Sequence, residues 1–482
     1  MEIKGFCLAA PSVVSAGEEI VLKGKVLTEP YTVDWSCYAR PPGLVGIYNR
    51  SPRGIAYMDN VMKDWEGIIS VDGGTGYKGP IKQSIQKAAS AGSRSSRAFF
   101  RIPGIKFSTP GVKFITLRDK KTGIEGISNA ILVTEKPIPL RLYWADPHSQ
   151  TFFSDGLRCP EELYTFARDE AFLDIFAVTD HSEWITDRQW EYFRAVTNDF
   201  NRDGEFVTLV GQEWTNREFG HRNIYYPGDK GPVLRADGPS ELKELYRIAR
   251  SFGALVIPHH SANVEMGVDW SKGYDAELEK LVEIYSIWGN SELPAQKGNT
   301  RPIRNHGGEK KGQHVIDALA RGYRFGFVGG GDIHDGRPGD ELHSKQKDIP
   351  LYAGLYRQGI TGIWASGLTR KDIFKALKKR MVYASSNVRI ILDFLVSGRP
   401  MGSTIRKPGA KSLQIKVFAA SEVPVSLVEI IKNGEVFSKT AVGGQVADTS
   451  VKDRDIGPGY YYARVTRTDG EMAWSSPVWI ER

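Results

Sequence analysis

The stretches LRLYWADPHSQTFFSDG at 140–156 and FLDIFAVTDH at 172–181 decide the fold predicted for the middle of this chain. Each begins with a short apolar run typical of a buried strand and ends on acids and histidines. From here to residue 380, such runs alternate with segments whose apolar residues recur at helical spacing. Alternating strands and helices are typical of a parallel sheet or barrel. The sequence therefore predicts an α/β domain over residues 138–387.

The elements expected in this domain follow one another in a regular order. Strands are predicted at 140–146, 172–180, 205–213, 254–260, 280–286 and 324–332. Helices are predicted at 159–170, 186–200, 240–253, 312–323 and 369–380. Thr186 and Gln189 have the spacing of a capping box, which supports the start of the second helix.

The two ends of the chain lack this alternation. Residues 1–137 and 388–482 contain short apolar runs broken by Gly, Pro, Asn and Asp, which predicts a β-sandwich at each end. The main exception is 80–90, where the spacing predicts a short helix. Two prolines in TEKPIPLR, 134–141, indicate a linker. We therefore expect three domains, with the α/β domain between the two sandwiches.

Length and composition are those of an ordinary globular protein. The 482 residues, 41% hydrophobic and 25% charged, suffice for several domains with buried cores. The three cysteines, Cys7, Cys37 and Cys159, have no CxxC spacing, so neither a disulfide framework nor a cysteine zinc site is expected. No window approaches the roughly 18 apolar residues of a membrane span, and the N-terminus lacks a signal-peptide pattern. We expect no membrane partner and, by default, a cytoplasmic location.

The net charge of +7 raises the question of a nucleic-acid partner. The basic residues are scattered, and the densest segment, KALKKR at 375–380, ends a predicted helix, where basic side chains complement the helix dipole. We therefore expect no nucleic-acid partner and favour a small-molecule or carbohydrate substrate that is anionic. Exposed sandwich edges leave a homo-oligomer open.

All nine histidines lie between residues 148 and 343, and the predicted sandwiches have none. Acids and histidines also follow the predicted strands, namely Asp146 and His148, Asp180 and His181, Glu213, His259 and His260, and Asp332 and His334. Any one of these could be a helix cap or a core histidine. Because parallel strands of a barrel end on one face, we expect the whole set to meet there. Imidazoles mixed with carboxylates suit zinc, manganese or iron.

The order of these motifs resembles a known family. D-x-H-x-x-T-x-x-S-D-G, T-D-H, G-x-E, P-H-H and G-G-D-x-H, over roughly residues 140–385, resemble the PHP-domain (polymerase and histidinol phosphatase) metallohydrolases. With its flanking β regions, the chain looks most like the branch that includes carbaryl-hydrolase-like enzymes. The resemblance implies a distorted, TIM-like (β/α)7 barrel that holds one to three divalent ions.

The resemblance also implies a set of metal-binding residues, which are His148, Gln150, Asp155, His181, Glu213, His221, His259, Asp332 and His334. Glu213 matches the acid that bridges two ions. His259 is favoured over His260 because it is the first histidine after Pro258. Gln150 stands where the family has a second histidine. Since an amide is a weaker ligand than an imidazole, one site is expected to be weaker, empty or replaced by a polar contact.

The predicted chemistry is hydrolysis of an ester, phosphoester, carbamate or amide by a metal-activated water. Glu213 is an expected catalytic residue because it would bridge the metal ions, and His306 or His343 is expected to protonate the leaving group. Arg337, just after the last metal motif, is a candidate to contact substrate. The glycines at 329–331 precede D-I-H rather than GK[ST], so we interpret them as backbone room beside the site and not as a phosphate loop.

Two other functions stay open. A metal-dependent lyase could act on a uronate-type carbohydrate, because metal ions acidify a proton next to a carboxylate. A binding protein without activity could use the same scaffold, and Gln150 is the only residue that favours it.

Overall fold

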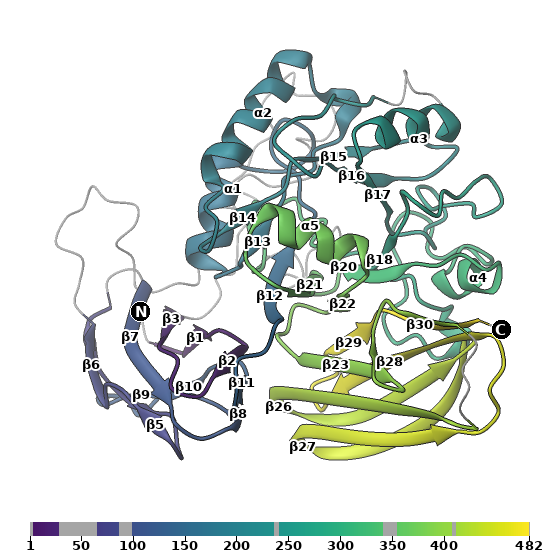
Figure 1. Ribbon diagram of the computed structural model, residues 1–482. Helices are drawn as coiled ribbons and strands as arrows, with labels where there is room; N and C mark the ends of the chain where they lie inside the picture. The colour runs from purple at the N-terminus through teal and green to yellow at the C-terminus, as the bar shows by residue number, and fades with distance from the viewer. Residues whose placement is uncertain are drawn as a thin grey trace.

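The computed structural model describes residues 3–27, 65–85, 99–235, 241–340, 354–406 and 411–481. Strands dominate the structure, which is 42% strand and 14% helix. The N-terminal strands lie to one side of the middle region, and the C-terminal strands lie beneath it (Figure 1). No helix in these described residues is both long and apolar enough to cross a membrane.

The described N-terminal strands form three small sheets. The first sheet contains β1 (Gly5–Ala9), β3 (Ile20–Leu27), β7 (Phe99–Phe107) and β5 (Tyr77–Lys78). The second contains β10 (Glu125–Ile127), β9 (Thr116–Asp119), β4 (Gly67–Asp72) and β6 (Lys82–Ile85). The third contains β2 (Val13–Ser15), β11 (Ile131–Thr134) and β8 (Gly111–Lys113). Their inward side chains share one core that includes the fully buried Leu22, Ile102 and Leu117. The helix predicted at 80–90 is wrong over β6, and its remaining residues lie outside the described ones.

A 13-stranded sheet of the described residues joins the middle region to the C-terminal region. Its main order is β14 (Val207–Thr208), β13 (Ile175–Phe176), β12 (Arg141–Asp146), β21 (Ile360–Ala365), β22 (Val382–Ser385), β29 (Met472–Ser475), β28 (Gly459–Arg467), β26 (Leu413–Lys432), β23 (Ile391–Val396) and β24 (Arg399–Pro400). Three further strands join it, namely β25 (Thr404–Arg406), β27 (Glu435–Asp453) and β30 (Val478–Glu481). Because β22 pairs with β29, Ala384 opposite Trp474, backbone hydrogen bonds cross the predicted boundary at 387/388.

Two smaller sheets and five α-helices complete the described part of the middle region. One sheet contains β15 (Gly211–Trp214), β16 (Arg222–Tyr225) and β17 (Leu255–Pro258), and the other β19 (Gly289–Asn290), β18 (Leu281–Ser286) and β20 (Gly326–Gly329). The helices are α1 (Pro160–Thr165), α2 (Asp187–Phe200), α3 (Leu242–Ser251), α4 (Val315–Ala320) and α5 (Arg370–Lys378). A π-helical segment, Phe166–Glu170, continues α1. The capping box of Thr186 and Gln189 at the start of α2 is confirmed.

The predicted distorted (β/α)7 barrel, and with it the TIM-like barrel that the PHP resemblance implied, is wrong. The structure is mostly β, and its middle strands divide among separate sheets. Antiparallel pairs join β12 to β21 and β16 to both β15 and β17, whereas a (β/α) barrel has parallel strands throughout. Each helix predicted between residues 159 and 380 has a counterpart, but apolar runs do not reveal strand direction, so the alternation is not enough to predict the architecture.

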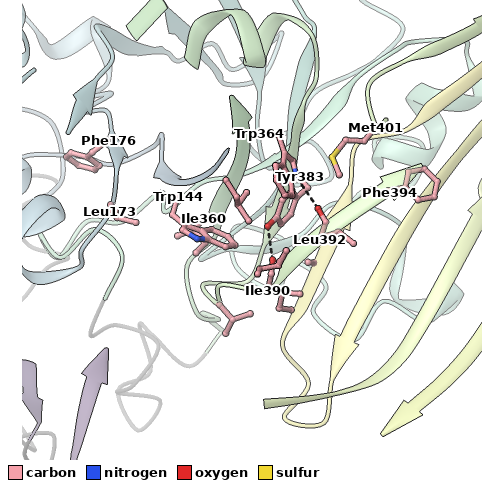
Figure 2. Packing of buried hydrophobic residues seen from close by; sticks show 14 of the residues in the cluster. Trp144, Leu173, Phe176, Ile360, Trp364, Tyr383, Ile390, Leu392, Phe394 and Met401 are labelled. Atoms are coloured by element: carbon pink, nitrogen blue, oxygen red, sulfur yellow. Dashed lines mark hydrogen bonds between the residues drawn. The ribbon is translucent and has the colours of Figure 1, made fainter. Parts of the chain in front are cut away.

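Aromatic side chains fill the core where the middle and C-terminal regions meet (Figure 2). The Trp144 and Tyr383 rings pack edge to face with centroids 5.9 Å apart. The Tyr383 hydroxyl donates to the carbonyl of Ile390 at 2.7 Å, and the Trp364 indole N–H donates to that of Leu392 at 3.1 Å. Buried polar atoms need such partners, so these bonds fix how β23 lies against β21 and β22.

A buried carboxylate also joins the two regions. Glu292, between β19 and α4, is 1% exposed. It accepts hydrogen bonds from the Tyr462 hydroxyl at 2.7 Å, the Trp474 indole at 2.8 Å and the Arg464 guanidinium at 3.1 Å, all from the C-terminal strands. Loss of this carboxylate would leave the buried donors of Tyr462 and Trp474, and the partly exposed Arg464 guanidinium, without this acceptor.

We therefore expect Glu292→Ala to lower the free energy of unfolding by about 3 kcal/mol. The matched control is Glu435→Ala, which removes a 3.2 Å ion pair with Lys297 across the same junction from a carboxylate that is 80% exposed. That change should cost less than about 1 kcal/mol. Urea unfolding of the full chain measures both, and equal effects of the two substitutions would contradict this view of the junction.

Candidate metal centre

The acids and histidines predicted at strand ends do meet in space. β12 lies parallel to β13, and β18 lies parallel to β20. Two isolated parallel bridges continue this contact beyond the strands, Ser149 with Ile333 and His181 with Glu213. The bridges place the residues after β12 beside those after β20, and the residues after β13 beside β15. The short strands thus deliver side chains from distant segments to one place.

Three groups of side chains result, and within each group the candidate ligand atoms lie within 4.8 Å of one another. The first group contains His148, His259, Glu283 and Asp332; the second contains Glu213, His221, His259 and His260; the third contains Asp155, His181 and His334. His259 belongs to both the first and the second group. The first two groups are fully buried, whereas the Asp155 and His334 side chains are 20% and 15% exposed, so the third group faces solvent.

Glu213 lies between the groups. Its carboxylate contacts four imidazoles, at 2.6 Å from His221 Nδ1, 3.1 Å from His259 Nε2, 3.4 Å from His148 Nε2 and 3.4 Å from His181 Nδ1. Burial alone would raise the pKa of Glu213, but the charges of His181 and His259 hold it well below its usual value. Glu213 is therefore a buried carboxylate anion that touches members of all three groups.

The first two groups contain polar atoms that the protein itself does not satisfy. Within the described residues, His259 Nδ1, His260 Nδ1 and Asp332 Oδ2 are buried without a hydrogen-bond partner. His259 Nδ1 and Asp332 Oδ2 face each other at 3.7 Å, which is too long for a hydrogen bond. Two ligands that each lie about 2.0–2.2 Å from one ion are separated by about this distance. The nitrogen and oxygen donors therefore fit a divalent metal ion.

In the third group, Asp155 lies between two histidines. One of its oxygens is 3.1 Å from His334 Nε2 and 3.5 Å from His181 Nε2. Burial opposes ionisation, but the His334 and His181 charges lower the pKa of Asp155. Two tryptophans border the group: Trp184 packs against His181 with ring centroids 4.8 Å apart, and Trp288 against His334 at 6.0 Å.

Two further acids position the segments that carry these groups. One Asp146 oxygen accepts the backbone N–H groups of His148 at 3.1 Å and Gly331 at 2.7 Å, which ties the end of β12 to the segment after β20. Asp180 accepts the backbone N–H and the hydroxyl of both Thr151 and Ser154, next to Asp155. Burial raises the pKa of Asp146 to about 8 and that of Asp180 to about 6.

The backbone beside the three groups leaves space for their side chains and has unusual φ angles at two positions. A Cβ at Gly330 would overlap the Glu283 carboxylate, and one at Gly331 would overlap that of Asp146, so the predicted backbone room is confirmed. His260 and Asp332 have φ values of 32° and 49°, in the left-handed region that residues other than glycine rarely adopt. Strain of this kind is concentrated at functional sites.

Eight of the nine predicted ligands belong to the three groups, and Gln150 does not. Its amide nitrogen donates to Glu213 at 2.6 Å, and its oxygen accepts from the Ser154 hydroxyl at 3.1 Å, which makes it a polar contact of Glu213. His260 and Glu283 join the groups in addition. The only sequence signal for Glu283 is a lone carboxylate within the apolar run KLVEIYS at 280–286.

The other predicted catalytic residues lie elsewhere. His306 packs on Trp288 with ring centroids 5.0 Å apart and lies 3.6 Å from Glu265, so its ring shares this tryptophan with His334. Arg337 is fully buried, donates to Asp340 and lies over the Phe166 ring. His343 lies outside the described residues.

Residues 310–399 match a family model described as a protein of unknown function (DUF3604). An uncharacterized protein of Chlamydia pneumoniae is 30% identical over 406 residues, and one of Chlamydia muridarum is 29% identical over 407. Each match covers 80% of this chain and 64% of the relative, so the chain spans just under two thirds of these relatives' length.

Two solved structures show weak likeness to this chain. The fibronectin(III)-like modules of Clostridium thermocellum CbhA match with a TM-score of 0.15 and 20% identity, over 18% of this chain and 94% of that one. A β-glucuronidase of Bacteroides uniformis matches with a TM-score of 0.21 and 9% identity, over 99% of this chain and 61% of that one. At such TM-scores these likenesses carry no argument about fold or activity.

We expect the protein to retain at least about two equivalents of Zn²⁺ or Mn²⁺ per chain after dialysis and gel filtration, measured by elemental analysis. His259→Ala should remove at least one equivalent, because this histidine belongs to two groups. The control is His314→Ala. His314 is equally buried and lies 3.4 Å from Glu309, but is in none of the groups. Equal metal content of the two variants would contradict the assignment.

Proposed function

We propose that the protein is a metal-dependent hydrolase that cleaves an ester, phosphoester, carbamate or amide bond. The observation that supports this most is the pair of shared side chains: His259 belongs to two ligand groups, and the anionic Glu213 touches all three. Clustered divalent ions, when bound, lower the pKa of a water and stabilise negative charge on the reacting group.

The donor types indicate which ions would be held. Neutral imidazoles combined with carboxylates suit zinc, manganese or iron better than magnesium or calcium, which prefer oxygen alone. His148, His259, Glu283 and Asp332 would hold one ion, and Asp155, His181 and His334 another. Glu213, His221 and His260 form the remaining group together with the shared His259. Gln150 fixes the orientation of the Glu213 carboxylate through its 2.6 Å hydrogen bond.

Substrate would approach from the third group, the only one of the three with partly exposed side chains. Trp184, 45% exposed, packs against His181 of this group and can contact the apolar part of a substrate. The first two groups are buried, so they exclude bulk water and strengthen electrostatic interactions with a reacting group. His306, which packs on Trp288, stays a predicted proton donor to the leaving group.

Hydrolysis of p-nitrophenyl acetate and of bis(p-nitrophenyl) phosphate tests the proposal. We expect turnover by protein loaded with Zn²⁺ or Mn²⁺, its loss on treatment with a chelator, and its return on adding metal. Glu213→Gln should lower kcat by at least about 100-fold, because it removes the anion that joins the groups. Glu241→Gln, on the exposed start of α3, should leave kcat unchanged.

Far-ultraviolet circular dichroism and the unfolding midpoint show whether the Glu213 variant is folded. A folded Glu213→Gln protein with undiminished turnover would refute the proposed role. Metal-loaded wild-type protein that hydrolyses neither ester would refute hydrolysis of these bond types.

A further inference from the structure

A second site lies away from the metal centre, in a cleft of about 720 Å³ between three segments. The end of the linker contributes Pro139 and Leu140, the region around α5 contributes residues from Trp364 to Met381, and the chain at β24 contributes residues from Arg399 to Ser403. Ligand sites prefer such junctions and typically have volumes of about 300–1,000 Å³. The size and the place of the cleft therefore suit one small molecule.

The cleft is at the opposite end of β12 and β21 from the metal centre. These strands are antiparallel, with Arg141 opposite Ala365 and Ala145 opposite Thr361. Ala365 lines the cleft, whereas Asp146, at the other end of β12, contacts the metal-binding segments. A six-residue strand spans roughly 17 Å, so one ligand of moderate size cannot occupy both sites.

The cleft combines an apolar floor with a basic rim. Trp364 is 8% exposed and forms the floor with the partly buried Leu140 and Met381. Among the described residues, five cationic side chains line the cleft, namely Lys375, Lys378, Lys379, Arg380 and Arg399, against the single carboxylate of Asp372. The excess positive charge is thus concentrated in a small space around an apolar surface.

Most of this charge is uncompensated. Lys378 donates to the carbonyl of Gly253, and Arg380 donates to that of Arg324 and lies over the Trp479 ring. By contrast, Lys379 and Arg399 have no ion pair or side-chain hydrogen bond with any other described residue.

Asp372, which accepts hydrogen bonds from Ser366 and Thr369, is an anion but supplies one negative charge against the five cations. Like charges brought together in a concave site repel one another, and a bound anion relieves this.

We propose that this cleft binds a small organic anion, with its apolar body on Trp364 and its carboxylate, phosphate or sulfonate group between Lys379 and Arg399. A purely inorganic anion would leave the apolar floor exposed to water. An uncharged apolar molecule would leave the rim uncompensated. The site is independent of the metal centre and does not rest on the hydrolase activity.

Isothermal titration of the full chain with naphthalene-2-sulfonate, a rigid aromatic anion without a hydrolysable bond, tests the proposal. We expect one equivalent to bind, with affinity that falls as NaCl is raised from 50 to 500 mM. Lys379→Glu/Arg399→Glu should weaken binding at least about tenfold. The control Lys120→Glu/Lys121→Glu reverses two exposed lysines of the N-terminal region and should leave the affinity unchanged. The uncharged naphthalene-2-methanol should bind at least about tenfold more weakly than the sulfonate.

If the reversed pair destabilises the protein, Lys379→Gln/Arg399→Gln provides the same comparison without added negative charge. Three results would overturn the proposal: absence of binding to the wild type, unchanged affinity in the Lys379 and Arg399 variants, or loss of binding in His181→Ala. The last result would place the probe in the metal centre instead.

Discussion

The buried carboxylate of Glu213, in contact with four imidazoles, is the interaction on which the rest of the middle region depends. Removing such a charge from water costs several kcal/mol unless partners surround it. The partners come from segments far apart in the sequence, after β12, after β13, before β16 and after β17. Each strand must therefore end close to the same point. The bridges Ser149–Ile333 and His181–Glu213, and the bonds accepted by Asp146, hold those ends together.

The surrounding structure stabilises this arrangement of buried charges. The large sheet continues from β12 through β21 and β22 into the C-terminal strands, so the C-terminal region supports the strands that carry the site. Aromatic packing around Trp144 and Tyr383 and the buried Glu292 network close the same junction. A rigid frame of this kind can maintain the positive φ angles of His260 and Asp332, which would otherwise relax.

Much of the candidate site could be predicted from the sequence, but the architecture could not. Acids and histidines after short apolar runs are a local signal, and eight of nine predicted ligands meet in the three groups. Helix starts are equally local, as the capping box at Thr186 shows. Strand direction depends on partners that are distant in the sequence. The antiparallel pairing of β16 with β15 and β17 therefore has no local sequence signal, and for this reason the predicted barrel is wrong. Glu283 was missed as a ligand because one acid in a buried strand has no repeating pattern.

The most direct test of the metal centre is a crystal structure of protein grown with Mn²⁺, with data collected at the manganese absorption edge. We predict anomalous peaks within the three groups, at least one of them among His148, His259, Glu283 and Asp332 and another among Asp155, His181 and His334. A well-ordered structure with no anomalous peak within reach of Glu213 would contradict this prediction.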